Sequence, residues 1–233
     1  FGIDRVTIAK MGQQSEHEFM NVKCGIMDQF IIAVGKKDNA IMLDCNTLEY
    51  RYVPLELGDY RVVVMNTNKK RQLADSKYNE RRGECMTGLA ILQAHTKIDA
   101  LCELSPSEFE KRADTITDSI IRKRVKHCVY ENDRVKKAVT ALEKGDLTLL
   151  GKLLCESHVS LRDDYEVTEE AIRAEGCIGA RMTGAGFGGC AIAIVHKDFV
   201  KTFVERVRSA YASRTGIEAS FFACSSGNGV FSL

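Results

Sequence analysis

Apolar residues recur along this chain at helical spacing in some segments and at strand spacing in others. The first segment carries an apolar series typical of a helix, Ile3, Val6, Ile8 and Met11. No capping residue is evident before it, so we expect a helix that the chain enters partway. The segment "CGIMDQFIIAVG" predicts a second helix from near Gly25 to Gly35, because glycine is the usual residue just past a helix end.

Strand patterns occupy the next stretch of the chain. "NAIMLDCNTLEYRYVPL" alternates apolar and polar residues on either side of Asn46 and Thr47, which predicts two strands, and "YRVVVMNT" predicts a third. We expect the strands of 40–66 to pair within one sheet, completed by residues that would precede this chain.

Helices dominate the middle of the chain. We predict a helix over 75–95, entered through Asp75 or Ser76 as the cap. "SPSEFEKRA" then has the Ser-x-x-Glu spacing of a capping box and begins a helical region, which continues with helices near 117–144 and 146–160. The last portion is predicted as helix, strand, glycine loop, strand, a helix over 197–212 and a strand over 218–223. Because helices and strands do not alternate regularly, the class is α+β.

The glycine loop lies in "CIGARMTGAGFGGCAIAIV", residues 177–195, and it formally satisfies the dinucleotide fingerprint G-x-G-x-x-G. That fingerprint requires a strand before it and a helix directly after it. Here the apolar run "CAIAIV" follows, which predicts a second strand, so we exclude an NAD-binding site of the Rossmann type.

The same loop retains another possible role. Gly184, Gly186, Gly188 and Gly189 lack a Cβ, so they can adopt positive φ and let the backbone approach a ligand. Consecutive N–H groups in such turns form concavities that bind anions. A purely structural turn between two packed strands is the alternative, and the loop by itself does not decide between them.

Composition narrows the function classes. The net charge of +1 over 233 residues gives no electrostatic case for nucleic acid or an anionic membrane. No apolar run approaches the length of a membrane span. The nine cysteines form no C-x-x-C pair, so we interpret them as free thiols in a reducing cytoplasm, neither disulfides nor zinc ligands. We assign no role to any histidine.

Two segments carry polar residues of chemical interest. Asp28 lies in the first turn of the helix predicted from Gly25, where the helix dipole favours an ionised carboxylate that could accept a proton from a substrate hydroxyl. "NTNKKRQLADSKYNERRGEC" follows a strand, and its Tyr78 could contact a polar ligand while Lys69, Lys70 and Arg71 could attract phosphate. The alternative for Asp28 is a carboxylate that only complements the helix dipole. The alternative for the second segment is a solvated basic loop.

Taken together, "CGIMDQF" (24–30), "NTNKKRQLADSKYNERR" (66–82) and "GARMTGAGFGGC" (179–190) resemble the galactokinases, a family of the GHMP kinase superfamily. The likeness extends over nearly the whole chain. It implies ATP-dependent transfer of a phosphoryl group to the C1 hydroxyl of galactose, with Mg²⁺, by a cytoplasmic protein that is a monomer at full length.

The resemblance also implies roles for particular residues. Asp28 would be the acid beside the anomeric hydroxyl, and the backbone of Gly25 and the hydroxyl of Tyr78 would contact the sugar. The loop with Gly184, Gly186 and Gly188 would lie near the nucleotide phosphates. The implied fold is a GHMP kinase C-terminal domain with ferredoxin-like α/β layers over 67–233. Residues 1–66 would be the end of an N-terminal domain like domain 2 of ribosomal protein S5.

Some parts of the family pattern are absent from these 233 residues. They lack the family's first motif, its second Gly/Ser-rich loop that cradles ATP, and its usual magnesium ligands. The junction at 166–170 is also shorter than in the family, which indicates a deletion or missing residues. We therefore expect a C-terminal piece of a longer protein. Alternatives are a kinase for N-acetylgalactosamine or another sugar, and a sugar sensor without enzymatic activity.

Overall fold

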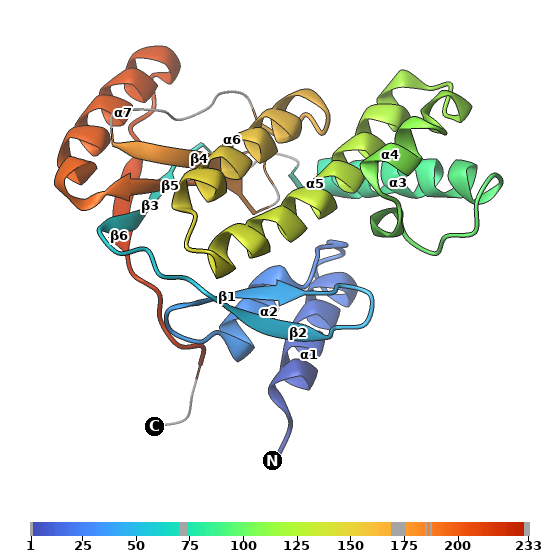
Figure 1. Ribbon diagram of the computed structural model, residues 1–233, viewed down its shortest axis with the longest axis horizontal. Coiled ribbons are helices and arrows are strands. Elements are labelled where there is room, and N and C mark those ends of the chain that lie inside the picture. Colours follow the sequence, from blue (N-terminus) through green and yellow to red (C-terminus); the bar gives the residue numbers. More distant parts are fainter. Residues whose placement is uncertain (1, 70–73, 169–175, 185, 187, 231–233) are drawn as a thin grey trace.

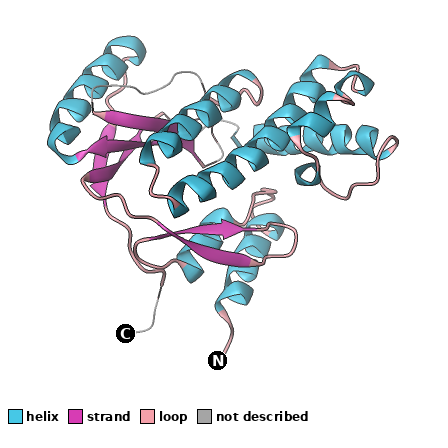
Figure 2. Cartoon of the chain, viewed as in Figure 1, coloured by secondary structure: helices cyan, strands magenta, loops and turns pink. Residues whose placement is uncertain are grey.

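A computed structural model describes residues 2–69, 74–168, 176–184, 186 and 188–230. The chain forms two parts (Figures 1 and 2). The N-terminal part contains two helices and a two-stranded antiparallel hairpin: α1 (Arg5–Glu18), α2 (Met27–Val34), β1 (Asn39–Leu43) and β2 (Tyr50–Pro54). The C-terminal part, 60–224, is built on a four-stranded sheet with the order β4-β5-β3-β6.

The four strands of this sheet pair antiparallel throughout and are covered on both faces. They are β3 (Tyr60–Asn66), β4 (Cys177–Thr183), β5 (Cys190–His196) and β6 (Ser220–Cys224). Val195 packs with Phe203 of α7 (Val200–Thr215), which follows a short 3₁₀ helix (Lys197–Phe199). The neighbouring Ile194 packs with Leu150 of α6 (Leu147–Asp163). Since successive side chains on a strand point to opposite faces, α6 and α7 cover opposite faces of the sheet.

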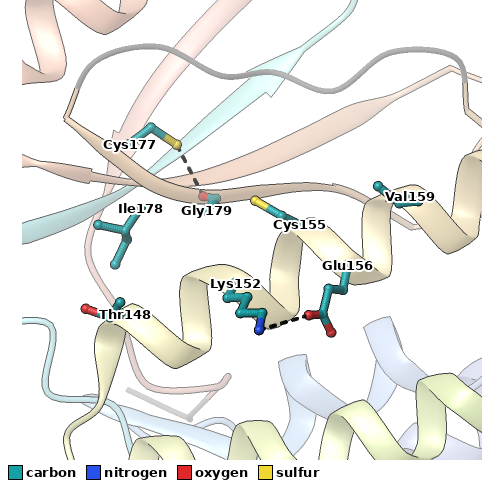
Figure 3. A pocket seen from close by; sticks show the side chains of 8 residues that line it. All are labelled: Thr148, Lys152, Cys155, Glu156, Val159, Cys177, Ile178 and Gly179. Atoms are coloured by element: carbon teal, nitrogen blue, oxygen red, sulfur yellow. Dashed lines mark hydrogen bonds and ion pairs between the residues drawn. The ribbon is translucent and has the colours of Figure 1, made fainter.

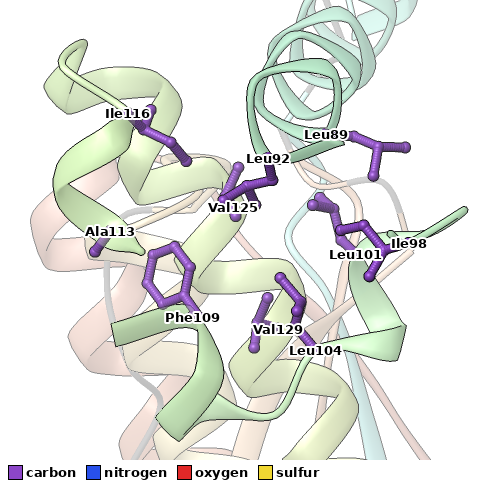
Figure 4. Packing of buried hydrophobic residues seen from close by; sticks show 10 residues of the cluster. All are labelled: Leu89, Leu92, Ile98, Leu101, Leu104, Phe109, Ala113, Ile116, Val125 and Val129. Carbon is purple, nitrogen blue, oxygen red and sulfur yellow. The ribbon is translucent and has the colours of Figure 1, made fainter. Parts of the chain in front are cut away.

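A separate helical region extends away from the sheet (Figure 1). It comprises α3 (Ala74–Gln93), 3₁₀ turns at Leu101–Glu103 and Ala113–Thr115, α4 (Pro106–Glu110) and the long α5 (Ser119–Glu143). Its apolar core joins all these elements, and Leu92, Ile116, Val125 and Val129 are completely buried there (Figure 4). α5 continues from this core to the sheet, where Ala141 packs near Leu150. One helix thus connects the two cores.

The periodicity of the sequence predicted most of these elements correctly. Ser105 and Glu108 form the predicted capping box, with Ser105 N–H donating to Glu108 Oε2 at 2.9 Å, and Gly35 follows the last residue of α2. The α+β class is confirmed. The helix expected before β4 falls on 169–175, outside the described residues, and so do residues 169 and 170 of the short junction at 166–170.

Three predictions about local structure are wrong. α1 is not entered partway, because Asp4 caps it and accepts a hydrogen bond from Thr7 N–H at 2.9 Å. α3 begins at or before Ala74, so Asp75 and Ser76 lie inside the helix and do not cap it. The strands of 40–66 do not share one sheet: β3 pairs with β5 and β6, whereas β1 pairs with β2. The domain division at 66/67 stays a prediction, although this pairing favours a boundary before β3.

The C-terminal tail returns to the N-terminal part after β6. Gly229 N–H donates to Gly35 O at 2.7 Å and Val230 N–H to Ile32 O at 2.8 Å. Asp38 N–H donates to Ser226 Oγ at 2.9 Å. The tail thereby forms hydrogen bonds with the end of α2 and with the turn before β1. These bonds hold the N-terminal part against the C-terminal part.

Apolar side chains remain exposed on the two helices of the N-terminal part. Ile8 and Met11 on α1 expose 51% and 55% of their surface, and Met27 and Ile32 on α2 expose 55% and 58%. Among the described residues, no helix is long and apolar enough to cross a membrane.

Two glycines of α3 provide a matched test of packing in the helical core. A Cβ added at Gly88 would overlap Val125 Cγ2, whereas at Gly83 nothing lies within 4 Å. We predict that Gly88→Ala destabilises the chain by about 1–3 kcal/mol through overpacking. Gly83→Ala should stabilise it by about 0.5–1 kcal/mol through helix propensity. Urea unfolding of both variants measures these changes, and equal effects would contradict the close α3–α5 packing.

Candidate active site

The loop 21–25, which leads into α2, is attached to the first turns of α3. Gly25 N–H donates to Tyr78 Oη at 3.1 Å, and Lys23 N–H donates to Asn79 Oδ1 at the same distance. Asn79 Nδ2 donates in turn to Asn21 O at 3.3 Å, and Arg82 Nη1 to Lys23 O at 3.1 Å. Successive residues of one helix turn thus satisfy the backbone of a loop more than fifty positions away in the sequence.

The helix α1 holds the same loop from another side. Gln13 Nε2 donates to Cys24 O at 3.1 Å, and His17 Nε2 lies 2.8 Å from the same carbonyl oxygen. The loop has no regular secondary structure, and Asn21 has a φ of 55°, in the left-handed region. Because an irregular backbone must satisfy its polar groups through side chains or water, these contacts define the path of the chain into α2.

Asp28 lies in the first turn of α2, as the sequence predicted, and its side chain is exposed. Ile26 occupies the N-cap position and provides no side-chain hydrogen bond, so no cap competes for the first N–H groups of the helix. Those groups carry partial positive charge, which favours the ionised form of a nearby carboxylate. Within the described part of the chain, the Asp28 carboxylate makes no hydrogen bond or ion pair. It is therefore an accessible proton acceptor.

Tyr78 is half-buried, and its burial raises the pKa of its hydroxyl, so the group stays protonated. The oxygen accepts the Gly25 N–H, and we find no acceptor for the hydroxyl hydrogen among the described residues. Tyr78 can therefore donate to a ligand without releasing Gly25. The structure brings Gly25 and Tyr78 together, and Asp28 follows Gly25 by three positions at the start of α2.

The glycine loop joins β4 to β5, which are antiparallel neighbours with Thr183 opposite Cys190. Strand, loop and antiparallel strand follow one another, so the strand predicted directly after the glycine loop is confirmed. Gly184, Gly186, Gly188 and Gly189 have φ values of 78°, 82°, 114° and 87°, in the region that side chains disfavour. The glycines therefore meet a conformational need, as the sequence predicted. Gly189 O accepts from both Thr67 N and Thr67 Oγ1, at 2.9 and 2.8 Å, which fixes one end of the loop on β3.

Contacts within the C-terminal part connect this loop to Tyr78. A Cβ added at Gly186 would lie 2.7 Å from Val167 Cβ, so the loop lies directly on the segment 164–167. That segment contacts α3 one turn beyond Tyr78, where Arg81 Nε donates to Tyr165 O at 2.8 Å. The two candidate groups, the loop 21–25 with Tyr78 and the glycine loop, are thus connected to each other through α3 and the segment 164–167.

A hollow between α6 and β4 lies elsewhere in the structure. It has a volume of about 600 Å³ and is bordered by α6 and β4, with Lys152, Cys155 and Ile178 among its lining residues (Figure 3). None of the predicted site residues lines it. Because the Gly25–Tyr78 contact and the glycine loop provide the relevant chemistry, we locate the candidate site there and not in this hollow.

Sequence interpretation missed several residues that build the site. Asn79, Arg82, Gln13 and His17 hold the loop 21–25, and His17 had been assigned no role. Asn79 and Arg82 follow Tyr78 in "KYNERR", so their proximity to a candidate residue was the available signal. Of the predicted phosphate-attracting residues, Lys70 and Arg71 fall outside the described residues. No group of three or more His, Cys, Asp or Glu side chains in the described ranges is placed to hold a metal ion.

Comparison with known proteins places this fold in a class. Residues 138–213 match the model of the GHMP kinase C-terminal domain. Crystal structures of mevalonate kinases share the fold at 15% and 18% identity, with TM-scores of 0.55 and 0.53. The matched stretch contains α6, β4, the glycine loop, β5 and most of α7, so this part of the chain resembles a GHMP kinase C-terminal domain, the fold class expected from the sequence.

Within that class, the chain is similar to the galactokinases. It is 54% identical to galactokinase from Clostridium beijerinckii over 97% of this chain and 60% of that protein. The crystal structure of Lactococcus lactis galactokinase complexed with galactose matches with 47% identity and a TM-score of 0.94, over 98% of this chain and 61% of the other. The chain thus spans about three fifths of these relatives. The alignment with Clostridium tetani galactokinase covers 239 residues, more than the 233 present here, so that relative has residues without a counterpart in this chain.

The contact between Tyr78 and Gly25 can be tested directly. We predict that Tyr78→Phe destabilises the chain by about 0.5–1.5 kcal/mol, because the Gly25 N–H loses its acceptor. The Gly25 amide should exchange with solvent faster in this variant. Tyr130→Phe is the matched control, since the Tyr130 hydroxyl donates to Glu110 at 2.7 Å, on a different helix pair. Hydrogen exchange that is unchanged at Gly25 in Tyr78→Phe would exclude the contact.

Proposed function

We propose that this chain is the C-terminal part of a galactokinase, which transfers the γ-phosphoryl group of ATP to the C1 hydroxyl of galactose. The observation that carries this proposal is the exposed Asp28 carboxylate at the start of α2, directly after the loop that Tyr78 and Asn79 hold. The similarity to galactokinases at about half identity supports the choice of substrate. The nine cysteines and the use of ATP fit a cytoplasmic location.

Asp28 orients the sugar hydroxyl and accepts its proton as the phosphoryl group transfers. General-base assistance of this kind contributes about 10²–10⁴-fold. Tyr78 donates its free hydroxyl hydrogen to the sugar. Because the Gly25 N–H already donates to Tyr78, the backbone group of Gly25 that remains for the sugar is its carbonyl oxygen.

The glycine loop supports the phosphates of ATP. Its positive φ values turn the backbone so that N–H groups can face an anion, and no Cβ obstructs the approach. Magnesium would neutralise the phosphate charge when bound. The described residues provide no cluster of metal ligands, so we assign the metal to no residue of this chain.

The role of Asp28 is testable in the longer protein completed from its gene. We predict that Asp28→Asn lowers kcat about 10²–10⁴-fold, since asparagine is nearly isosteric but accepts a proton poorly. Galactose binding should persist. Asp99→Asn is the control, because Asp99 is also exposed but lies after α3 in the helical region. Near-normal kcat in a folded Asp28→Asn variant would exclude a chemical role for Asp28. An assay with N-acetylgalactosamine beside galactose identifies the sugar.

The 233 residues alone should not phosphorylate galactose at a useful rate. The family's ATP cradle and part of its sugar-binding motif are not among them, and phosphoryl transfer depends mainly on placing nucleotide, metal and hydroxyl. The exposed apolar side chains of α1 and α2 should also favour aggregation of the isolated chain. An ADP-release assay with ATP and galactose compares these 233 residues with the longer protein. Turnover by this chain within about tenfold of the longer protein would show that the active site is elsewhere.

A further inference from the structure

The most completely buried charged side chain described is that of Arg124 on α5, which exposes 2% of its surface. Its Nε donates to Glu84 Oε2 at 2.8 Å, Nη2 to Glu166 Oε2 at 2.7 Å and Nη1 to Asp164 O at 2.6 Å. One guanidinium therefore joins three segments of the chain: α3, α5 and the segment 164–167. A buried arginine in this arrangement uses its planar geometry, which a lysine cannot reproduce.

Each of the two segments that Arg124 joins leads to one half of the candidate site. On α3, Glu84 lies in the helix that presents Tyr78, Asn79 and Arg82 to the loop 21–25. On the other side, Glu166 precedes Val167, against which Gly186 of the glycine loop packs. The segment 164–167 thus contacts the glycine loop on one side and α3 on the other.

The backbone at Glu166 needs such an attachment. Its φ is 56°, in the left-handed region, which a residue with a side chain adopts only when its surroundings hold it there. The same carboxylate accepts from Arg124, and Lys123 Nζ lies 3.8 Å from its other oxygen. Arg81 adds a parallel link, because its Nε donates to Tyr165 O while its Nη1 pairs with Glu84 Oε2 at 3.1 Å.

We propose that Arg124 is a positioning residue for phosphoryl transfer: its hydrogen bonds to Glu84, Glu166 and the Asp164 carbonyl set the glycine loop at its working distance from Tyr78 and the loop 21–25. The proposal rests on the proposed function for its chemistry. Arg124 touches neither half of the site itself and acts through α3 and Val167. Phosphoryl transfer requires both halves of the candidate site in one fixed arrangement. Sugar binding requires only the half that consists of the loop 21–25 and Tyr78.

The test is Arg124→Lys in the longer protein, with Arg122→Lys as the matched control. Arg122 lies two positions away on α5, where its Nε donates to Ile116 O and its Nη1 to Asp114, and no contact described joins it to 164–167. We expect Arg124→Lys to lower kcat about tenfold to a hundredfold, the range that a misplacement near 1 Å produces, while KM for galactose stays within about threefold. Arg122→Lys should leave both constants unchanged.

A second variant separates positioning from folding. Glu166→Gln removes the charge from a partner that exposes 47% of its side chain, so the fold should persist, and kcat should again fall with little change in KM. A kcat of Arg124→Lys within about twofold of the parent value would overturn the proposal. An equal loss of kcat in Arg122→Lys would also overturn it, as would a loss of galactose affinity in Arg124→Lys that parallels the loss of kcat.

Amide hydrogen exchange provides a readout that does not depend on activity. In Arg124→Lys, peptides covering 164–167 and 184–189 should exchange faster, while those covering α7 should not change. If the parent protein phosphorylated no galactose, the proposed function would fail, and this measurement would still decide the role of Arg124. Unchanged exchange in both peptides would overturn that role.

Discussion

The site depends on one constraint, which is that the irregular loop 21–25 must satisfy its backbone polar groups without a helix or a sheet. Side chains of α1 and α3 meet this requirement, with Gln13 and His17 on one side and Tyr78 and Asn79 on the other. Since α2 begins directly after the loop, the same hydrogen bonds place Asp28. The candidate proton acceptor is therefore positioned by residues far away in the sequence, and the loop keeps its path without a strand or helix of its own.

Local patterns predicted the elements of this fold because the cause of each element is local. The capping box at Ser105, the glycine after α2 and the alternation in β1, β2 and β3 all report the conformation of a few neighbouring residues. The partner of β3 could not be predicted in this way. Its alternation shows that it is a strand, but pairing with β5 involves residues about 130 positions later, and the same pattern suits either sheet.

The candidate site was only partly predictable for a related reason. Asp28 and the glycines could be singled out from residue type and position, and Tyr78 and Gly25 gained a common role only through family resemblance. Asn79, Arg82 and Arg124 look like solvated polar residues on helix surfaces, because sequence periodicity does not distinguish a face that meets water from one that meets a loop. Arg124 lies in "IRKRVKH" close to Arg122, Lys123 and Lys126, yet among these four charged residues only Arg124 is buried.

The return of the C-terminal tail has a mechanical consequence. The N-terminal part is connected to the sheet by the chain between β2 and β3 and, independently, by the tail through Gly229 and Val230. Both connections lie on the same side of the N-terminal part, and the loop 21–25 meets α3 on the other side (Figure 1). Two attachments define an axis, and rotation about that axis is the rigid-body motion that distorts both attachments least. Contacts away from this axis oppose that rotation, because Gly25 N–H and Lys23 N–H donate to Tyr78 and Asn79 of α3, and Arg51 of β2 donates to Glu143 of α5.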